Sequence, residues 1–343
     1  MPLWFWLLVA VPALPAAGLL YQWLGTRRDR RAFPSPGRFV ELKDGCRIHL
    51  HDTGGAGPCV WLEAGLAASS IGWRRVMNSF TDAGFRVIAM DRAGYGWSAP
   101  ASAPRRMPQL VGELRQAIVL SGAPLPLIMV GHSFGGLLLR HYAAQFPVDV
   151  SALVLLDPLE PFEYHPLSPE NAARLRRGAA LARRGALLAR FGVVRLALDV
   201  LLAGGQTIPK FLARISSGRG SAVTTRLVGE VRKLPAELWP AVAAHWRQPR
   251  AFRTLAEYLE LLPENCAFPL HPEAAAAIPT GVVSAGTAPP AVVEAHRQTA
   301  ARAAAGLHLL AAASGHWVHL DQPDVARNLV MELLHLKTSQ ERI

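Results

Sequence analysis

A serine held between two glycines is the residue of this sequence best suited to nucleophilic chemistry. Ser133 lies in residues 131–135, Gly-His-Ser-Phe-Gly, which fit the pattern Gly-x-Ser-x-Gly. The nearly all-apolar run Pro126–Val130 precedes it and predicts a strand buried on both faces, whereas Leu137–Phe146 after it has a helical pattern. A serine in a tight strand-to-helix turn has its Oγ held clear of the sheet. The pattern therefore predicts that Ser133 is a nucleophile.

A free hydroxyl is a poor nucleophile at neutral pH, so Ser133 needs a base. His316 lies in a Gly-flanked loop directly after the apolar strand pattern Leu307–Ala311, where its ring can reach over the strand ends. His319, three residues later, is the competitor, and we expect it to be a polar neighbour. His132 points away from Ser133 if the segment turns sharply, so we expect it to pack or hydrogen-bond beside the nucleophile.

Alternating strand and helix patterns surround these residues and predict the layers that position them. A hairpin comes first, and strands and helices then alternate along the chain. This order is typical of a three-layer α/β fold with a mostly parallel sheet, whose core we place in residues 38–158 and 272–338. The predicted strands are 39–43, 47–52, 59–64, 86–91, 126–130, 152–157, 281–284 and 307–311, and the predicted core helices are 71–83, 109–120, 137–146, 291–304 and 323–336.

Five short motifs make the chain resemble the α/β-hydrolase superfamily over residues 38–160 and 275–338. They are Glu-Ala-Gly-Leu at 63–66, Asp-Arg-Ala-Gly-Tyr-Gly-Trp-Ser at 91–98, the serine motif, Leu-Leu-Asp-Pro at 155–158 and Ser-Gly-His-Trp at 314–317. The chain is most similar to membrane-anchored bacterial serine hydrolases with an apolar N-terminus, an Arg-rich stretch and a Leu-Glu-Ala-Gly-Leu segment. The resemblance implies a triad in the chain order nucleophile, acid, histidine.

The acid departs from the commoner pattern of this superfamily, in which it follows the strand before the penultimate helix. Here residues 284–290 after that strand contain no carboxylate, and the first one beyond them is Glu294, inside a helix. Asp157 ends the strand after the serine helix, and Glu160 is a second candidate nearby. We assign the role to Asp157, which would hold the histidine tautomer and stabilise the imidazolium. The alternative is that Asp157 only caps a strand.

Two backbone N–H groups, those of Leu66 and Phe134, are expected to form an oxyanion hole. Leu66 is assigned from its position after the strand 59–64 and not from its side chain. Arg92 and Glu63 lie at neighbouring strand ends, so we expect a buried ion pair that braces the loop before Leu66.

Composition describes a large, basic chain with few cysteines. The 343 residues are enough for one large domain or two small ones, and 51% of them are apolar. Cys46, Cys59 and Cys266 show neither metal-ligand spacing nor a disulfide framework, which favours a reducing compartment and implies no metal or organic cofactor. The net charge is +11, but we find no nucleic-acid recognition motif and expect no nucleic-acid partner.

Residues 1–25 predict a single transmembrane anchor. Leu3–Leu24 is uncharged and about long enough to cross a bilayer, which takes roughly 20 residues. The basic, Pro-rich residues 26–37 read as a linker, and their four arginines would keep the catalytic domain on the cytoplasmic side. A cleaved signal peptide is one alternative. A kinked or interfacial helix is another, because Pro12 and Pro15 lie inside the apolar run.

Residues 159–271 lack the sheet pattern and predict a helical lid. Residues 176–182, Arg-Arg-Gly-Ala-Ala-Leu-Ala, nearly repeat as residues 183–189, which places arginines on one side of a helix and small residues on the other. From His165 to Lys233 there are 13 Lys and Arg residues against three acidic ones, so this segment carries +10 of the net charge of +11. The lid is either a solvated basic cover or a surface that lies on anionic lipid headgroups.

We expect a membrane-associated serine hydrolase that cleaves a carboxylic ester through an acyl-enzyme, with Ser133, His316 and Asp157 as its catalytic residues. A hydrophobic acyl or alcohol part is favoured by apolar lid residues, namely Leu187, Leu188, Phe191, Leu196 and Leu198. Amidases, thioesterases, acyltransferases and perhydrolases use the same constellation, and a non-catalytic binding protein is the alternative from another class. An epoxide hydrolase or dehalogenase with an aspartate nucleophile is disfavoured, because residue 133 is Ser.

Overall fold

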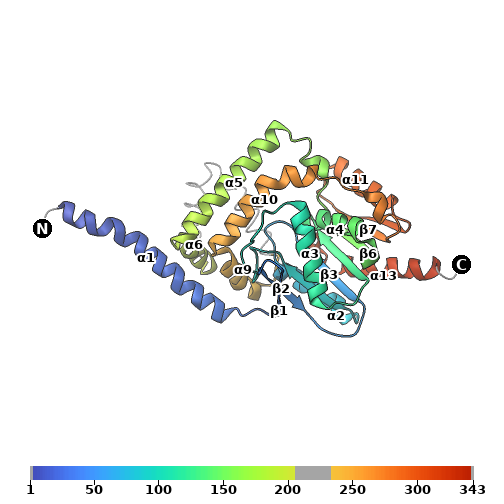
Figure 1. The fold of residues 1–343 in the computed structure, drawn as a ribbon, viewed down its shortest axis with the longest axis horizontal. Helices are drawn as coiled ribbons and strands as arrows, with labels where there is room; N and C mark the ends of the chain where they lie inside the picture. The colour runs from blue at the N-terminus through green and yellow to red at the C-terminus, as the bar shows by residue number, and fades with distance from the viewer. Residues whose placement is uncertain (1–2, 205–232, 341–343) are drawn as a thin grey trace. The chain divides into compact units, whose positions relative to one another are not determined.

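The computed structural model describes residues 3–204 and 233–340 (Figure 1). The chain divides into two compact units. The helical unit comprises Met1–Pro34 and Arg174–Leu259, and the sheet unit comprises Ser35–Ala173 and Glu260–Ile343. Each unit is described by itself.

The described residues of the sheet unit contain one sheet of eight strands in the order β1-β2-β4-β3-β5-β6-β7-β8. The first two strands pair antiparallel with each other, and β2 pairs antiparallel with β4, while all other neighbours are parallel. The predicted α/β fold with a mostly parallel sheet and an antiparallel start is confirmed. The strands are β1 Arg38–Glu41, β2 Arg47–Asp52, β3 Cys59–Glu63, β4 Arg86–Asp91, β5 Leu127–His132, β6 Val150–Leu156, β7 Thr280–Ala285 and β8 Gly306–Ala311.

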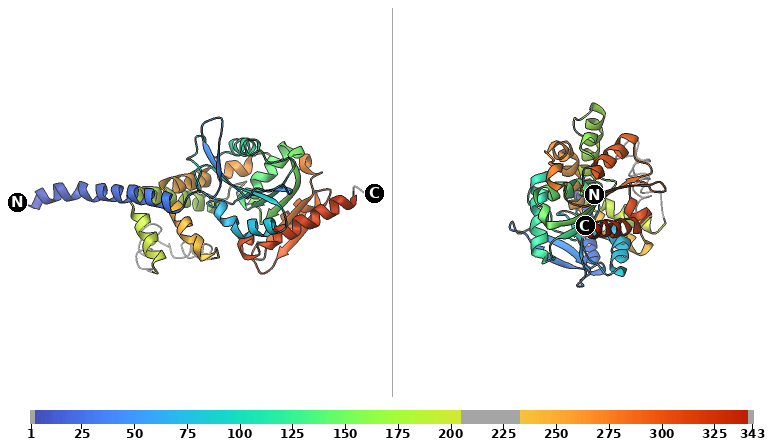
Figure 2. Two further views of the ribbon diagram at one scale, coloured as in Figure 1. Left: turned by 90° about the horizontal axis from the view of Figure 1, so that it is seen from below. Right: turned by 90° about the vertical axis from the view of Figure 1, so that its right-hand side faces the viewer.

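Helices cover both faces of this sheet, which is why its central strands are apolar runs without alternation. Helices α2 and α13 pack together on one face, and their apolar residues share a core with Val60, Val130 and Val283. Helices α4 and α11 lie on the other face, with α3 packed against α4 (Figure 2). The helices are α2 Arg74–Asp82, α3 Met107–Ser121, α4 Phe134–Gln145, α11 Pro290–Ala301, α12 Val318–Asp321 and α13 Asp324–Gln340.

Short 3₁₀ turns connect these elements, and they account for one difference from the predicted boundaries. The helix predicted over residues 71–83 begins as a 3₁₀ turn, Ser70–Trp73, before α2. The other 3₁₀ turns are Pro147–Asp149, Pro161–Glu163, Ala236–Leu238 and Pro272–Ala275.

The segment predicted as a lid is helical in its described parts. It contains α5 Pro169–Arg190, α6 Val193–Leu202, α9 Trp239–Trp246 and α10 Pro249–Ala267, while residues 205–232 lie outside the described residues. Its role as a cover over the site stays a prediction.

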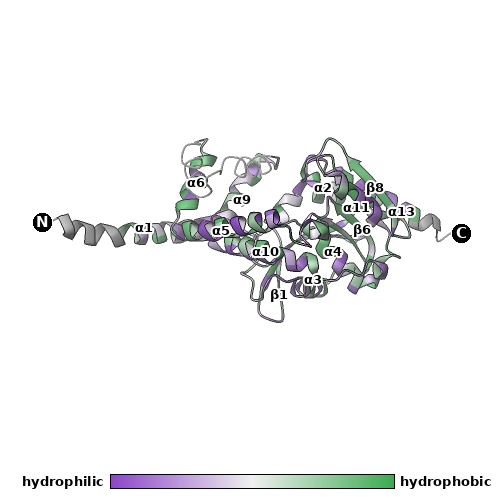
Figure 3. Cartoon of the chain, turned by 90° about the horizontal axis from the view of Figure 1, so that it is seen from above, coloured by the Kyte–Doolittle hydropathy of each residue, from purple (hydrophilic) through white to green (hydrophobic). Residues whose placement is uncertain are grey.

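Helix α5 has the two sides that its sequence repeat predicts. Its arginines are exposed, and the helix mixes purple and green along its length in Figure 3. On the other side, a Cβ on Gly185 would lie 2.6 Å from the Phe252 ring, and a Cβ on Gly178 would lie 3.1 Å from Leu259. The glycines therefore let α5 and α10 approach closely.

The N-terminal helix α1, Leu3–Ala32, packs against the helical unit through polar groups. The Asp29 carboxylate lies 2.8 Å from Arg195 Nη1 and 3.1 Å from Arg247 Nη1, and all three side chains are buried. Gln22 Nε2 donates to the Arg247 carbonyl at 2.9 Å, and Gln22 Oε1 accepts from Arg195 Nε at 3.1 Å. The opposite face is exposed and apolar, with Leu20, Trp23 and Leu24 about half accessible to solvent.

Within residues 3–204 and 233–340, no helix combines the length and apolar character needed to cross a bilayer. The transmembrane helix predicted over residues 1–25 is thus not found in the structure. The apolar pattern of Leu3–Leu24 did not reveal that Gln22, near its end, contacts Arg195 and Arg247 inside the protein.

Candidate active site

The nucleophile candidate sits in a strained turn between β5 and α4. Ser133 has φ 53° and ψ −122°, a backbone conformation that residues other than glycine rarely adopt. The chain can turn this tightly because the residues two positions before and after Ser133, Gly131 and Gly135, lack side chains. A Cβ on Gly131 would lie 2.9 Å from the Gly135 backbone, and a Cβ on Gly135 would collide with the carbonyl oxygens that end β3. The predicted strand-to-helix turn is therefore present.

His316 reaches this serine from the loop after β8. Its Nε2 lies 3.0 Å from Ser133 Oγ. The loop is fixed from two sides, because Asp321 Oδ2 accepts from Ser314 Oγ at 3.0 Å and from Gly315 N at 2.9 Å. On the other side, His132 Nε2 donates to the His316 carbonyl at 2.8 Å. His132, the residue before the serine, thus hydrogen-bonds beside the nucleophile candidate.

The competitor His319 is buried in α12 and belongs to an aromatic cluster. Its ring centroid lies 4.4 Å from that of His132 and 4.6 Å from that of Trp73. Of the two candidate histidines, His316 is the one within hydrogen-bond distance of Ser133 Oγ.

Asp157 contacts the other nitrogen of His316. The Nδ1 atom of His316 lies 2.6 Å from Asp157 Oδ2, and Asp157 Oδ1 accepts from the Ala285 N–H at 2.9 Å. A carboxylate can only accept, so Nδ1 carries the proton and Nε2 is left to accept the Ser133 hydroxyl proton. Asp157 itself has φ 43°, which aims its side chain across the ends of β6 and β7.

The alternative acids have other partners. Glu160 is buried and accepts from Arg140 Nη1 at 3.0 Å, while its backbone N–H donates to Glu163 in a capping box. Glu294 is exposed on α11 and pairs with Arg297. Of the three candidate carboxylates, Asp157 is therefore the one that the structure brings to His316.

The loop before Leu66 is braced by the predicted buried pair. Arg92 Nη1 lies 2.6 Å from Glu63 Oε1, and the same guanidinium donates to the carbonyls of Ala64 and Gly65. Burial raises the pKa of Glu63, which the Arg92 charge opposes. Phe134 is the first residue of α4, so its N–H lies at a helix N-terminus. The N–H groups proposed for the oxyanion hole thus belong to a braced loop and a helix end.

Burial keeps the neighbouring groups in their uncharged forms. The pKa of His132 is lowered well below its ordinary value by burial, and the nearby His319 and His316 lower it further. Burial also raises the pKa of the Cys46 and Cys59 thiols to about 11 and that of Cys266 to about 12. Thiolates are therefore disfavoured at neutral pH, which leaves Ser133 as the nucleophile candidate of this unit.

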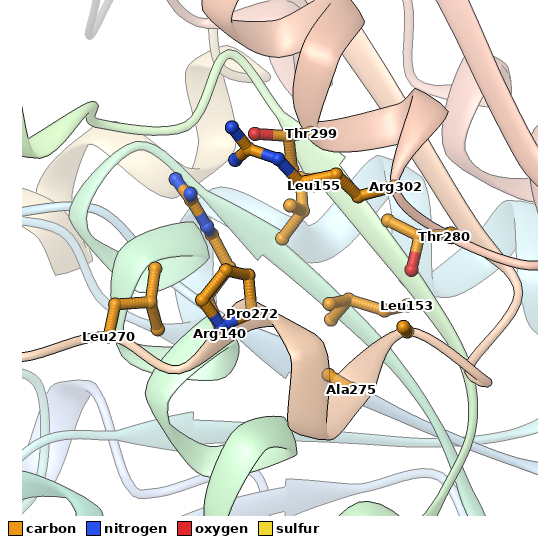
Figure 4. Close-up of a pocket in the computed structure, with 11 residues that line it drawn as sticks. Arg140, Leu153, Leu155, Leu270, Pro272, Ala275, Thr280, Thr299 and Arg302 are labelled. Atoms are coloured by element: carbon orange, nitrogen blue, oxygen red, sulfur yellow. The ribbon is translucent and has the colours of Figure 1, made fainter.

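A pocket elsewhere in the sheet unit does not include these residues. Its apolar lining comes from Leu153 and Leu155 of β6 and from the segment around Pro272. Figure 4 shows the side chains of Arg140 and Arg302 at this pocket, together with Thr299. It is therefore separate from the Ser133 constellation.

Three groups support these residues, and of them only His132 was predicted from the sequence to do so. The Ala285 N–H, the His132 ring and Asp321 each hold a member of the constellation by one or two hydrogen bonds. Only the position of His132, next to the serine, gave a signal for its role. The contacts of Ala285 and Asp321 depend on strand register and loop path.

Known proteins share this architecture and part of the sequence. A solved structure of the esterase EaEST from Exiguobacterium antarcticum has a TM-score of 0.60 and 18% sequence identity, over 87% of this chain and 99% of that one. Uncharacterized protein YqjL of Bacillus subtilis is 34% identical over 34% of this chain and 46% of its own length. Bifunctional epoxide hydrolase 2 of Rattus norvegicus is 33% identical over 36% of this chain and 22% of its own.

A fourth similar protein is the bifunctional esterase/perhydrolase DCH of Acinetobacter calcoaceticus, 32% identical over 36% of this chain and 45% of its own length. The chain thus spans less than half the length of these three curated relatives. The sequence model of the protein family described as the α/β-hydrolase fold matches residues 58–323, which is most of the sequence. This chain therefore belongs to the α/β-hydrolase fold family.

Proposed function

We propose that the protein is a serine hydrolase that cleaves a carboxylic ester, with Ser133 as nucleophile, His316 as base and Asp157 as the acid that orients it. The observation that carries this proposal is the continuous chain of contacts from Ser133 Oγ to His316 Nε2 at 3.0 Å and from His316 Nδ1 to Asp157 Oδ2 at 2.6 Å. Nucleophile, base and orienting group within hydrogen-bond reach are the signature of an activated serine.

The reaction begins when His316 Nε2 takes the Ser133 proton as Oγ attacks the ester carbonyl carbon. The carbonyl oxygen becomes an oxyanion, and the N–H groups of Leu66 and Phe134 stabilise its charge. Asp157 stabilises the imidazolium that forms. His316 then gives its proton to the departing alcohol, which leaves an acyl group on Ser133. A water molecule, deprotonated by His316, attacks the acyl-enzyme. His316 then gives that proton to Ser133 Oγ as the carboxylic acid is released.

The relatives include enzymes of more than one kind. The esterase/perhydrolase and the solved esterase support ester cleavage, whereas the relative from rat is an epoxide hydrolase. An epoxide hydrolase with an aspartate nucleophile is disfavoured for this chain, because the residue in the strand-to-helix turn is Ser133. Ester hydrolysis is therefore the proposal, with acyl transfer or amide cleavage as the alternatives that use the same residues.

A hydrophobic acyl or alcohol part is the proposed substrate feature. It rests on the apolar residues of α5 and α6, of which Leu187 and Leu196 are exposed. A panel of p-nitrophenyl esters of graded acyl length tests both points. We expect the rate of hydrolysis by the wild type to rise as the acyl chain becomes longer than acetate. Ser133→Ala should lower this rate by several orders of magnitude. Hydrolysis that is equal in both proteins would reject the proposal.

Association with a membrane surface is proposed in place of a membrane span. The exposed face of α1 carries Leu20, Trp23 and Leu24, and the exposed Arg27, Arg28, Arg30 and Arg31 follow it. The Arg27 guanidinium lies 3.6 Å from the centre of the Trp23 ring. Apolar side chains beside basic ones are the combination by which helices lie at anionic lipid surfaces. This location would place the enzyme near lipid-like esters.

A further inference from the structure

A buried chain of hydrogen bonds lies directly behind the acid candidate. His308 of β8 contacts Ser284 of β7, with 2.9 Å between His308 Nε2 and Ser284 Oγ. Ser284 Oγ lies 2.9 Å from His296 Nδ1 on α11. His296 Nε2 lies 2.9 Å from the carbonyl oxygen of Pro158, the residue after Asp157. Ser284 and His296 are fully buried, so the bond between them has no competition from water, whereas His308 is half-buried.

The protons in this chain can be assigned from the chemistry of its two ends. The Pro158 carbonyl can only accept, so His296 Nε2 carries a proton. Burial lowers the pKa of His296, which favours the neutral ring whose Nδ1 accepts. The Ser284 hydroxyl therefore donates to His296, and its oxygen accepts from His308 Nε2–H. Every donor in the chain has one acceptor, which makes the arrangement directional and rigid.

The hydrogen-bond chain ends on the carbonyl of Pro158, the residue directly after Asp157. Asp157 has φ 43°, a conformation that costs free energy unless neighbouring groups hold it. The same stretch of β7 holds it twice. Ala285 N–H donates to Asp157 Oδ1 at 2.9 Å, and the preceding Ser284 fixes His296, which donates to Pro158.

We propose that His296 is a positioning residue, which holds the Pro158 carbonyl, and with it the chain directly after Asp157, so that the Asp157 carboxylate meets His316 Nδ1. This inference rests on the proposed function of the Ser133, His316 and Asp157 constellation. It explains how an acid at the end of β6 is held in place when the loop after β7 supplies no carboxylate. The end of β7 supplies support to the acid instead.

The charged groups around His296 are few and paired. Glu160 Oε1 lies 4.0 Å from His296 Nε2, and Arg140 Nη1 contacts the same Glu160 oxygen at 3.0 Å. Asp157 also acts on His296 through space, as one of the causes that oppose the lowering of its pKa. Because Glu160 is neutralised by Arg140, the hydrogen bond to Pro158 is the direct link from His296 to the acid.

His296→Leu removes both hydrogen bonds, and His296→Gln keeps a donor that can reach the Pro158 carbonyl. We expect His296→Leu to lower kcat about 10- to 100-fold. This is the range found when the hydrogen-bond partners that orient metal ligands are removed from enzymes. KM should stay within about twofold, and the acid limb of the pH–rate profile should move to lower pH, since a displaced Asp157 stabilises the imidazolium less. His296→Gln should recover part of the loss, and Ser284→Ala should give a smaller loss of the same kind.

Val292→Ala is the matched control, because Val292 is buried on the same helix and its side chain has no hydrogen-bonding group. It should lower the melting temperature without moving kcat or the pH profile. Equal kcat values in His296→Leu and Val292→Ala would overturn the proposal. Ser284→Ala carries the test if His296→Leu does not fold, and a wild-type kcat and pH profile in Ser284→Ala would overturn it too.

A readout that needs no substrate separates this inference from the proposed function. The proton between His316 Nδ1 and Asp157 should give a strongly downfield ¹H NMR resonance in the wild type, which His296→Leu should shift or broaden and Val292→Ala should leave unchanged. An unchanged resonance in His296→Leu overturns the positioning role. If a fluorophosphonate does not label the wild type, although the resonance is present and changes in His296→Leu, the proposed catalysis is rejected instead.

Discussion

The carboxylate of Asp157 meets the imidazole of His316 at 2.6 Å, although the two residues are 159 positions apart and leave the sheet from β6 and β8. The strand between them, β7, contributes no acid but donates the Ala285 N–H to the free carboxylate oxygen at 2.9 Å. The acid therefore reaches over its neighbouring strand, and that strand orients it.

Replacing the acid separates its catalytic role from a structural one. Asp157→Asn keeps the size of the side chain and tolerates φ 43°, but it cannot hold the proposed histidine tautomer or stabilise the imidazolium. We expect kcat for a p-nitrophenyl ester to fall by roughly 10²- to 10⁴-fold with an unchanged circular dichroism spectrum. Glu294→Gln, on the exposed face of α11, is the control and should keep wild-type kcat.

The second candidate acid should show the opposite division between stability and activity. Glu160→Gln leaves the buried Arg140 guanidinium without its carboxylate, so we expect a loss of about 2 kcal/mol in the free energy of unfolding. Its kcat should stay near that of the wild type, because Glu160 does not contact His316. A large loss of kcat in Glu160→Gln, with Asp157→Asn near wild type, would transfer the role to Glu160.

The two histidines that follow β8, His316 in the loop and His319 in α12, provide a matched pair. His316→Gln should lower kcat about 10³-fold or more, because the base that activates Ser133 is lost. His319→Gln should retain most of the activity and lose stability instead, since His319 packs in the ring cluster with Trp73 and His132. Steady-state kinetics and thermal melts on both variants decide this. An inactive but stable His319→Gln would contradict the assignment.

Stability at acid pH should depend on His141, a buried histidine of α4. Burial, with help from Arg140 and His271, lowers its pKa from 6.5 to about 4. The unfolded chain therefore binds this proton at higher pH than the folded chain does. The contribution is complete above about pH 6.5 and is lost as the pH falls towards about 4.

Urea unfolding at pH 7.5 and pH 4.5 measures this effect. The wild type should lose about 2 to 3 kcal/mol more than His141→Leu between the two pH values, because one pKa unit corresponds to about 1.4 kcal/mol. His335→Leu, at an exposed position on α13, is the control and should follow the wild type. Parallel curves for the wild type and His141→Leu would show that the His141 ring does not titrate this way.

Binding to anionic vesicles tests whether the basic side of α5 lies on lipid headgroups, one of the two interpretations of the lid sequence. The full chain should sediment with vesicles that contain anionic lipid more than with neutral ones, and added salt should weaken this because the Debye length falls from about 10 Å at 0.1 M to about 3 Å at 1 M. Replacing four exposed α5 arginines with Gln should reduce binding without changing hydrolysis of a soluble ester. These are Arg176, Arg177, Arg183 and Arg184.

The matched control replaces four exposed arginines of the sheet unit with Gln, namely Arg74, Arg75, Arg297 and Arg302. This variant should bind vesicles as the wild type does. Equal sedimentation with neutral and anionic vesicles would leave α5 an ordinary solvated helix. Equal loss in the two variants would show that only net charge matters.

Local patterns were enough to predict the sheet and the turn at Ser133. The strands β2 and β4 fall on the predicted residues, because apolar runs between turn residues mark buried strands well. The glycines around Ser133 likewise record a local constraint, since only they fit between β3 and α4. The assignment of Asp157 came from noticing which loop lacked a carboxylate.

Long-range polar contacts left no such pattern. The chain from His308 through Ser284 to His296 depends on the register between β7 and β8 and on the face that α11 presents. The N-terminal helix shows the same limit from the other side. Its composition predicted a bilayer span over residues 1–25. In the structure, Asp29 of the same helix pairs with Arg195 and Arg247, which are more than a hundred residues away in the sequence.

The most direct test of the account is covalent capture of the nucleophile. The full-length protein is treated with a fluorophosphonate, digested and mapped by mass spectrometry. We predict one rapidly formed adduct, on Ser133, that is absent in Ser133→Ala and strongly slowed in His316→Gln, because only a serine activated by a base reacts quickly. No adduct in the folded wild type, or labelling of Ser133→Ala at the wild-type rate, would contradict the claim that Ser133 is an activated nucleophile.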